Sequence, residues 1–533
     1  MTTTDAAPTN AVTGPEAFRA AHATPRHDLA IEPWIPVVRL NGARDDIGLA
    51  ELFAESHTIG DLGEPDPLVR AALRRYLTAL TARLVLLAGT PDKASWMRRL
   101  NASSGFTHDE VAALLLDQKA HLWLYHPDTP FLQDSRLASP GIPFNKNWET
   151  SSDELETPLP GATSRAWAFK AGDLGVDAGL TWQRAARVLV ARWYYGLLGN
   201  GGGGDMGGAF PNGTSDAPLT HAFRVDPTSV FATLLRNITA SVVAPSAAPT
   251  RGLAWADAHR PSSGGDGLYL YSTTATACLL GPAETGQVIR RVLRGTIDDP
   301  PGSKETRKES KRAAREADPH RIRRSPDAKG KSRSDVRVPA GEPPLRRLHV
   351  LRRGMIESNS GAAHGVVRES DLWLSGAARR WDEGVELTLA NLAGSATSPQ
   401  WAASATVNVP SAYLDPEWER STDLTAMIDV GFGDRGVYPT LRLAIGRVFR
   451  GQEDPKKSVV GAALAARAHQ LWLVEADAII TAGLAGDLTA DEAEAGLWRA
   501  GREAVREVLA PYSSTSRYAG RVVQAIAAVR SPR

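Results

Sequence analysis

The segment Ser458-Val-Val-Gly-Ala-Ala-Leu-Ala-Ala-Arg-Ala-His-Gln-Leu-Trp-Leu-Val-Glu-Ala-Asp-Ala-Ile-Ile-Thr-Ala-Gly-Leu484 sets the architecture of the C-terminal part of this chain. Its Ala, Leu and Val residues recur at steps of three and four, which is the period of an α-helix. We expect its small residues to permit close helix approach; these are Ala462, Ala463, Ala465, Ala466 and Ala468. The same period returns in segments separated by short Gly, Pro or Asp joints, at 417–430, 438–450, 489–509 and 516–530. Together these segments predict an up-down helical bundle.

The sequence before this region mixes helix and strand patterns. Residues 29–40, followed by Asn41-Gly42, predict a β-hairpin, and residues 65–88, with leucines three or four apart, predict a long helix. A strand pair is expected at 268–274 and 287–293. We therefore predict an α+β fold, with a large mixed N-terminal domain over 28–385 and a C-terminal region over 386–533 that contains the bundle. Residues 1–27 are rich in Thr, Ala and Pro and predict a disordered tail.

The composition narrows the class of protein. A chain of 533 residues with a net charge of +1 and 42 % hydrophobic residues predicts an ordinary globular protein of two or three domains. It has no apolar run long enough to cross a membrane and no signal-peptide pattern, so we expect a cytoplasmic protein. The single cysteine, Cys278, excludes a thiolate zinc cluster, and we expect it to be a small buried residue. The histidines are scattered. We expect no metal enzyme, and no metal, cofactor or catalytic residues.

The run Gly199-Asn200-Gly201-Gly202-Gly203-Gly204-Asp205-Met206-Gly207-Gly208 is the clearest functional signal. Residues without a Cβ let the backbone lie flush against another molecule. Ordering so many glycines on folding, however, costs a large amount of conformational entropy. The spacing Gly-x-Gly-x-x-Gly matches a dinucleotide-binding fingerprint, yet an amphipathic helical pattern precedes the run, and the following residues do not predict a helix. The alternatives are a nucleotide site, a flexible linker, or a loop that enters the groove of a polymeric ligand.

A second signal is a local excess of positive charge. Residues 304–353 contain 17 Lys or Arg against 7 Asp or Glu in a chain that is nearly neutral overall. Such a segment is typical of a solvated, flexible insertion, which we place at about 300–335, or of an arm that contacts phosphates. The candidate phosphate contacts are Arg321, Arg323 and Arg324.

Several separated segments resemble the CasA family, the large subunit of the type I-E CRISPR surveillance complex Cascade. The opening motif of that family is similar to Trp34-Ile35-Pro36-Val37. A second element of the family is similar to Thr129-Pro130-Phe131-Leu132-Gln133. Further segments agree in order and spacing, namely Gly161-Ala162-Thr163, the glycine run, residues 318–325, Val338-Pro339 and Ala510-Pro511-Tyr512. The resemblance is patchy and covers about residues 28–533.

The resemblance implies a function. Members of that family read a short protospacer-adjacent motif in duplex DNA from the minor groove and begin strand separation. Carried over to this chain, the glycine loop is Gly199–Gly204, and a basic finger contains Arg290 and Arg291. A wedge hairpin between 389 and 409 contains Gln400 and Trp401, although Trp401 is also compatible with a half-buried core position. The loop that anchors the family's subunit on the guide RNA corresponds to Ala168, Phe169 and Lys170.

The minor groove is narrow and its hydrogen-bonding code degenerate, so backbone without Cβ atoms and thin cationic side chains fit it well. The leading hypothesis is therefore a non-catalytic DNA-recognition subunit. Its partners would be double-stranded target DNA, guide RNA, the other Cascade subunits, and a recruited helicase-nuclease or, in a variant system, a transposition factor. Two other hypotheses remain: a nucleotide- or phosphate-binding enzyme built on the glycine run, and a helical scaffold subunit without direct DNA contact.

Overall fold

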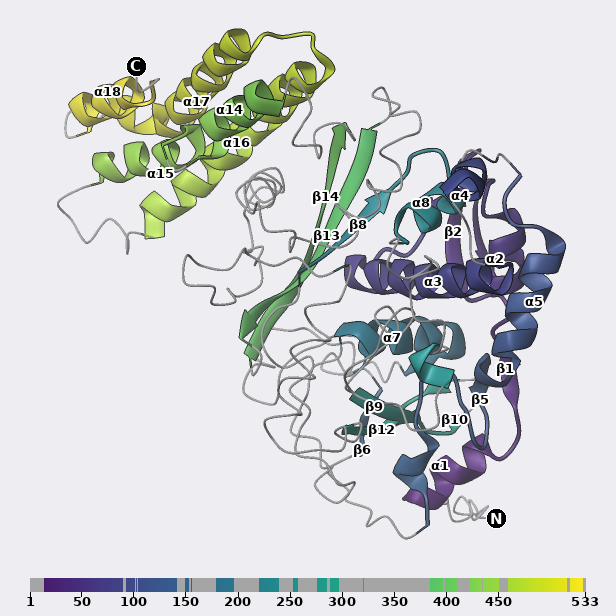
Figure 1. The fold of residues 1–533 in the computed structure, drawn as a ribbon. Helices are drawn as coiled ribbons and strands as arrows, with labels where there is room; N and C mark the ends of the chain where they lie inside the picture. The colour runs from purple at the N-terminus through teal and green to yellow at the C-terminus, as the bar shows by residue number, and fades with distance from the viewer. Residues whose placement is uncertain are drawn as a thin grey trace, which may run out of the picture. The chain divides into compact units, whose positions relative to one another are not determined.

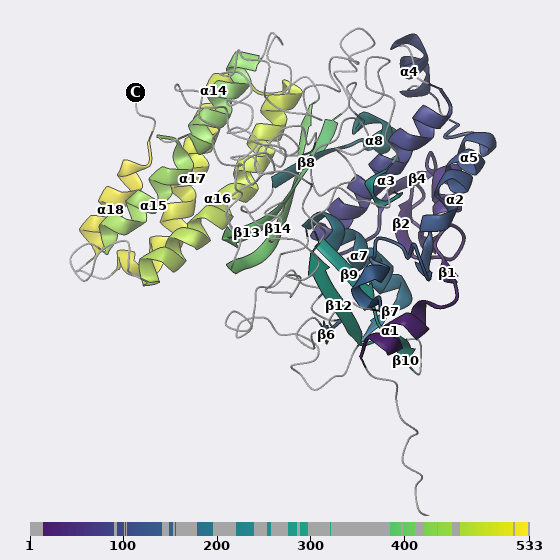
Figure 2. The same cartoon turned by 60° about the horizontal axis from the view of Figure 1, so that its bottom comes forward.

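The computed structural model divides into two compact units (Figures 1 and 2). Among the described residues, the first unit holds the chain up to residue 320 together with 385–395 and 398–406, and the second holds residue 384 and the chain from residue 407 onward. The structure describes residues 14–89, 93–100, 102, 104–140, 149–152, 155, 179–195, 220–238, 253–256, 276–284, 288–296, 320, 384–395, 398–410, 421–433, 435–449, 459–514 and 518–530.

The strands of the described chain form small sheets. They are ordered β1-β5, β3-β2-β4, β6-β12-β9, β10-β11-β7 and β14-β13-β8. The strands are β1 (Arg26–Asp28), β2 (Ile35–Arg39), β3 (Arg44–Ile47), β4 (Ile59–Leu62), β5 (Trp123–Tyr125), β6 (Glu149–Ser151), β7 (Leu180–Thr181), β8 (Thr220–Val225), β9 (Thr276–Leu280), β10 (Ala283–Glu284), β11 (Val288–Ile289), β12 (Arg291–Thr296), β13 (Gly384–Ser395) and β14 (Ser398–Pro410).

Helices pack among these sheets in the first unit. They are α1 (Pro15–His22), α2 (Leu49–Glu55), α3 (Pro67–Leu87), α4 (Lys93–Leu100), α5 (His108–Gln118), α7 (Trp182–Tyr195) and α8 (Val230–Arg236). Helix α3 contacts α5, α7 and α8, and Figure 1 shows α3 and α7 side by side. The buried apolar side chains of α3 and α7 belong to one hydrophobic core.

The predicted long helix is confirmed as α3, and its ends have local causes. Asp66 caps the N-terminus, because its carboxylate accepts from the backbone N–H groups of Leu68 and Val69. Pro67 occupies the first turn, where its missing N–H costs nothing. Most of the helix is buried, including Leu73, Leu77 and others of the leucines that predicted it, so α3 is the central helix of the unit.

The predicted hairpin is also confirmed. Strands β2 and β3 pair antiparallel, with Ile35 opposite Ile47 and Val38 opposite Arg44. Gly42 in the connection has φ +85°, the left-handed conformation that favours glycine and that the Asn-Gly signal predicts.

The disordered tail predicted over residues 1–27 is wrong from Pro15 onward. Residues 15–22 form α1, whose proline lies in the first turn and whose Glu16 suits the N-terminal end of the helix dipole. Phe18 is fully buried in a small apolar cluster with Leu137, Leu279 and Leu293. These partners lie far along the chain, so composition alone did not reveal the helix.

The strand predicted at 287–293 corresponds to β11 and β12, but its described partners differ from the expected one. Strand β12 pairs antiparallel with β9 on one side and with β6 on the other. Residues 268–274, the expected partner, lie outside the described residues. Cys278 in β9 is buried, as predicted.

The second unit contains the predicted helical bundle. Its described helices are α14 (Ser421–Phe432), α15 (Val437–Val448), α16 (Val459–Ala485), α17 (Ala490–Ser513) and α18 (Ala519–Ala528). Helix α17 begins with a capping box, in which Thr489 accepts from the Glu492 backbone and the Glu492 carboxylate accepts from the Thr489 backbone. The mixed first unit and this bundle confirm the α+β fold.

The alanines of α16 do not all serve close packing. Ala465 and Ala468 are buried, whereas Ala462, Ala463 and Ala466 are exposed, because successive residues of a helix point in different directions. A glycine provides a tighter approach: a Cβ on Gly501 would lie 2.6 Å from Cγ1 of Val437. Helices α15 and α17 therefore meet at a position that no larger residue can occupy without a shift.

Candidate nucleic-acid interface

Helix α7 (Trp182–Tyr195) shortly precedes the glycine run in the sequence. Gly199–Gly204 lie outside the described residues, but α7 ends at Tyr195, only four residues earlier. Its apolar side chains, such as Val188 and Leu189, are buried in the core of the first unit. The placement of α7 therefore determines where the chain departs toward the run.

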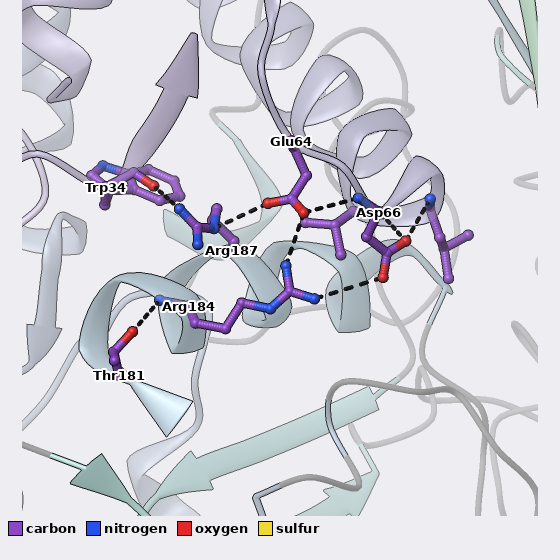
Figure 3. Close-up of polar contacts among 8 residues, drawn as sticks. Trp34, Glu64, Asp66, Thr181, Arg184 and Arg187 are labelled. Atoms are coloured by element: carbon purple, nitrogen blue, oxygen red, sulfur yellow. Dashed lines mark hydrogen bonds and ion pairs between the residues drawn. The ribbon is translucent and has the colours of Figure 1, made fainter. Parts of the chain in front are cut away.

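A cluster of charged side chains joins α7 to the elements around it (Figure 3). Nη1 of Arg184 lies 2.9 Å from Oε1 of Glu64, and Nε of Arg187 lies 3.0 Å from Oε2 of the same carboxylate. The contact between Arg187 and Glu64 is poorly aligned for a hydrogen bond, so its attraction is electrostatic. Nη2 of Arg184 also lies 3.7 Å from Oδ2 of Asp66.

The cluster is largely shielded from water. Glu64 is 0 % exposed, and the side chains of Arg184 and Arg187 are 21 % and 16 % exposed. Nη1 of Arg187 donates to the backbone oxygen of Trp34, at 3.1 Å. Burial lowers the pKa of the Arg187 guanidinium, and the Glu64 carboxylate opposes that shift. Because a carboxylate is costly to bury alone, the two guanidinium groups are what permit Glu64 to lie inside.

Two of the motifs that carry the family resemblance meet in the core. The rings of Trp34 and Phe131 pack edge to face with centroids 5.6 Å apart. Gln133 is also buried: its Nε2 donates to the Leu124 oxygen at 2.6 Å, and its Oε1 accepts from the Leu280 N–H at 2.7 Å. The glutamine thus joins β5 to β9, and both motifs have structural roles here.

The two finger residues lie at a strand end. Arg290 falls between β11 and β12, and its backbone oxygen accepts from the Ser152 N–H at 2.9 Å. Arg291 begins β12, forms an ion pair with Glu149, and places its guanidinium carbon 5.5 Å from the centre of the Phe18 ring. Arg291 is therefore engaged within the protein, and its role as a DNA-contacting residue stays a prediction.

Gln400 and Trp401 lie near the start of β14, which is next to β13 in the sheet β14-β13-β8. Residues 386–391 of β13 pair antiparallel with residues 220–225 of β8. This pairing ties the first strand of the hairpin to the first unit, while the domain boundary expected near residue 386 stays a prediction. The backbone is thus a hairpin, and the wedge role of Gln400 also stays a prediction.

Comparison with known proteins identifies the family. A model of the family described as CRISPR-associated protein Cse1 matches residues 28–343, more than half of the chain. This chain belongs to that family. The resemblance drawn from the separated motifs is thereby confirmed.

Individual relatives agree with this assignment. The CasA/Cse1 protein of Thermus thermophilus is 28 % identical over 220 residues, which cover 40 % of this chain and 39 % of that relative. The structure of Thermobifida fusca Cse1 has a TM-score of 0.68 at 18 % identity, covering 95 % of this chain and 97 % of that one. A chain of a CRISPR RNA-guided surveillance complex has a TM-score of 0.65 at 16 % identity, covering 95 % and 100 %. These structures share the fold of this Cse1-family chain.

Other expected site residues of this family member lie outside the described residues. They are the anchoring residues Ala168, Phe169 and Lys170, the glycine run, and the arginines Arg321, Arg323 and Arg324. One residue within the basic segment, His320, is described: it is buried and stacks on Phe223 of β8 with ring centroids 4.6 Å apart. His320 therefore lies beside strand β8 of the sheet that contains the hairpin.

The sequence reasoning missed the Glu64 cluster. Arg184 and Arg187 are three residues apart on an amphipathic helix, a spacing typical of a solvated face. Their partner lies 120 residues away from Arg184 in the chain, and no local pattern indicates such a pairing. In the part of the chain that the structure describes, no helix is long and apolar enough to span a bilayer.

Proposed function

We propose that this protein is the non-catalytic large subunit of a type I-E CRISPR RNA-guided surveillance complex. It recognises a protospacer-adjacent motif in duplex DNA from the minor groove, initiates strand separation and recruits an effector. The observation that carries this proposal is membership of the Cse1 family together with a glycine run placed just after a helix anchored in the core.

The proposed role of each site residue follows from the width and the hydrogen-bonding pattern of the DNA minor groove. The glycine loop Gly199–Gly204 lies against the minor groove, Arg290 and Arg291 supply positive charge, and Gln400 wedges beside the motif with Trp401 stacking on an unpaired base. Sequence beyond the motif is read by pairing with the guide RNA. Ala168, Phe169 and Lys170 anchor the subunit on the guide-RNA end of the complex.

The remaining partners are the other Cascade subunits and an effector. Cleavage requires a recruited helicase-nuclease, or a transposition factor takes its place in a variant system. The proposed location is the cytoplasm, where guide RNA and target DNA meet.

The test compares complexes assembled with and without this subunit on duplex targets that carry or lack the motif. We expect the motif preference to require the subunit. Within the complete complex, changing both Gly201 and Gly202 to Val should weaken binding to motif-containing duplex by about 1–3 kcal/mol.

A matched control is Gly520→Val, because a Cβ at Gly520 in α18 would meet nothing within 4 Å. It should leave duplex binding unchanged. If the complex keeps its motif preference without the subunit, the protein is a scaffold and the proposal fails.

A further inference from the structure

We propose that Glu64, Arg184 and Arg187 form a positioning device that sets the rotation and axial register of α7, and through them the point where the chain departs toward Gly199. The inference rests on the proposed role of the glycine run in DNA binding. It assigns these three side chains to that function without placing them in contact with DNA.

The first step concerns what a buried ion-pair cluster contributes. Removing charges from water costs about as much as their mutual attraction returns, so such clusters add little net stability compared with apolar packing of the same volume. The apolar face of α7, with Val188 and Leu189, already binds the helix to the core. The cluster is therefore better suited to fixing geometry than to holding the helix in place.

The second step concerns direction. Apolar contacts are non-directional, whereas the rigid fork of a guanidinium binds only along defined directions. The directional contacts here are the hydrogen bonds from Arg184 to Oε1 of Glu64, at 2.9 Å, and from Arg187 to the Trp34 oxygen, at 3.1 Å. Arg187 also places its charge beside the second Glu64 oxygen, and Figure 3 shows both side chains converging on the carboxylate. Sliding α7 by one residue would rotate its side chains by about 100° and break both contacts together.

The third step concerns what the cluster is attached to. Arg187 also donates to the Trp34 oxygen, just before β2, and Arg184 also reaches Asp66, the cap of α3. Glu64 is joined to the same cap, because its Oε1 accepts from the Asp66 N–H at 3.1 Å. The cluster thus connects α7 to two other parts of the fold, the start of strand β2 and the N-terminus of the central helix α3.

The test variant is Arg187→Lys in the complete complex with guide RNA. Lysine keeps the positive charge beside Glu64 but lacks the planar fork that spans Glu64 and the Trp34 oxygen. We expect affinity for motif-containing duplex to fall about fivefold, with the thermal midpoint of the free protein unchanged. Because net charge is preserved, the fall in affinity cannot come from a change in the overall charge of the protein.

The matched control is Arg83→Lys. Arg83 pairs with Asp117 between α3 and α5, and its side chain is 26 % exposed, compared with 16 % for Arg187. It should leave duplex affinity intact. Amide hydrogen exchange of the free protein over 182–204 should increase in Arg187→Lys and not in Arg83→Lys.

A double-variant cycle separates this inference from the proposed function. If the cluster acts through the loop, Arg187→Lys should add nothing to the loss caused by changing Gly201 and Gly202 to Val. Additive losses, or unchanged exchange over 182–204, overturn the positioning role while leaving the proposed function intact. No loss in the glycine variant overturns the proposed function itself, and the inference with it.

Discussion

The ring of Phe131 packs against the indole of Trp34 at an interplanar angle of 70°, so that two motifs almost a hundred residues apart close on each other in the core. Phe131 also meets Tyr76 of α3 edge to face, at 5.6 Å between ring centroids. Such pairs add to the free energy gained from burying the rings. These two family motifs therefore help to build the core of the first unit.

Phe131→Ala is expected to destabilise the protein strongly. The side chain is fully buried, and removing it leaves a cavity beside Trp34 and Tyr76. Truncations of this kind cost about 3–5 kcal/mol of unfolding free energy. Urea denaturation of the free protein measures the loss. Leu116→Ala is the control, because Leu116 is 75 % exposed and its truncation should change stability by less than about 0.5 kcal/mol. Equal losses in the two variants would contradict the packing role.

His22 is expected to make stability depend on pH. Burial lowers its pKa from 6.5 to about 4, although the hydrogen bond from its Nε2 to the Leu280 oxygen opposes the shift. Between these two values the unfolded chain binds a proton that the folded protein does not, so stability falls as the pH falls through this range. The pKa difference corresponds to a loss on the order of 3 kcal/mol.

The measurement is urea denaturation at several pH values from 7 to 4, compared between the native protein and His22→Gln. The amide keeps a donor for the Leu280 oxygen but does not titrate, so the variant should lose less stability on acidification. His108→Gln, at the exposed start of α5, is the control and should retain the native pH dependence. An identical pH dependence in His22→Gln and the native protein would rule out this role for the buried imidazole.

The sequence predicted the elements whose causes are local. The leucine spacing located α3 to within two residues at each end, and the bundle helices α15 and α16 were located equally well. The Asn41-Gly42 pair located the β2–β3 hairpin. In each case the period or the turn residue is itself the physical cause of the structure.

Features that depend on distant partners were not predicted. Helix α1 is short and is stabilised by burying Phe18 against residues more than a hundred positions later in the chain. The cluster of Glu64 with Arg184 and Arg187 has no local signature either, because neighbouring residues do not reveal which charges will be buried together. The site residues taken from the family resemblance stay predictions, and several of them lie outside the described residues.

The basic arm is expected to contribute to DNA affinity through phosphate neutralisation. Duplex affinity of the complete complex should fall as salt rises, with a slope of roughly −0.9 for each contact. Replacing Arg323 and Arg324 by Ala should flatten that slope by roughly one to two units. DNA-binding titrations at several salt concentrations measure the slope of log affinity against log salt concentration. Arg506→Ala is the control, because Arg506 pairs with Glu503 on α17. If the arm variant keeps the native slope, the segment is a solvated insertion.

Gln400 is expected to act on strand separation rather than on the first encounter with DNA. Unstacking a base step costs a few kcal/mol, and a side chain that fills the vacated space stabilises the opened duplex. Gln400→Ala and Trp401→Ala should therefore slow R-loop formation on a fully paired target. On a target already opened beside the motif, the same variants should form the R-loop at nearly the native rate.

The experiment measures R-loop rates of the assembled complex on paired and on bubbled DNA. The position of both residues near the start of β14, next to β13, provides a matched control farther along the same strand, Asn408→Ala, which should slow neither reaction. The ratio of the two rates is the informative quantity, because a variant that only weakens folding or assembly reduces both equally. Equal slowing on both substrates would therefore mean that the hairpin supports the structure of the complex, and the wedge role of Gln400 would be withdrawn.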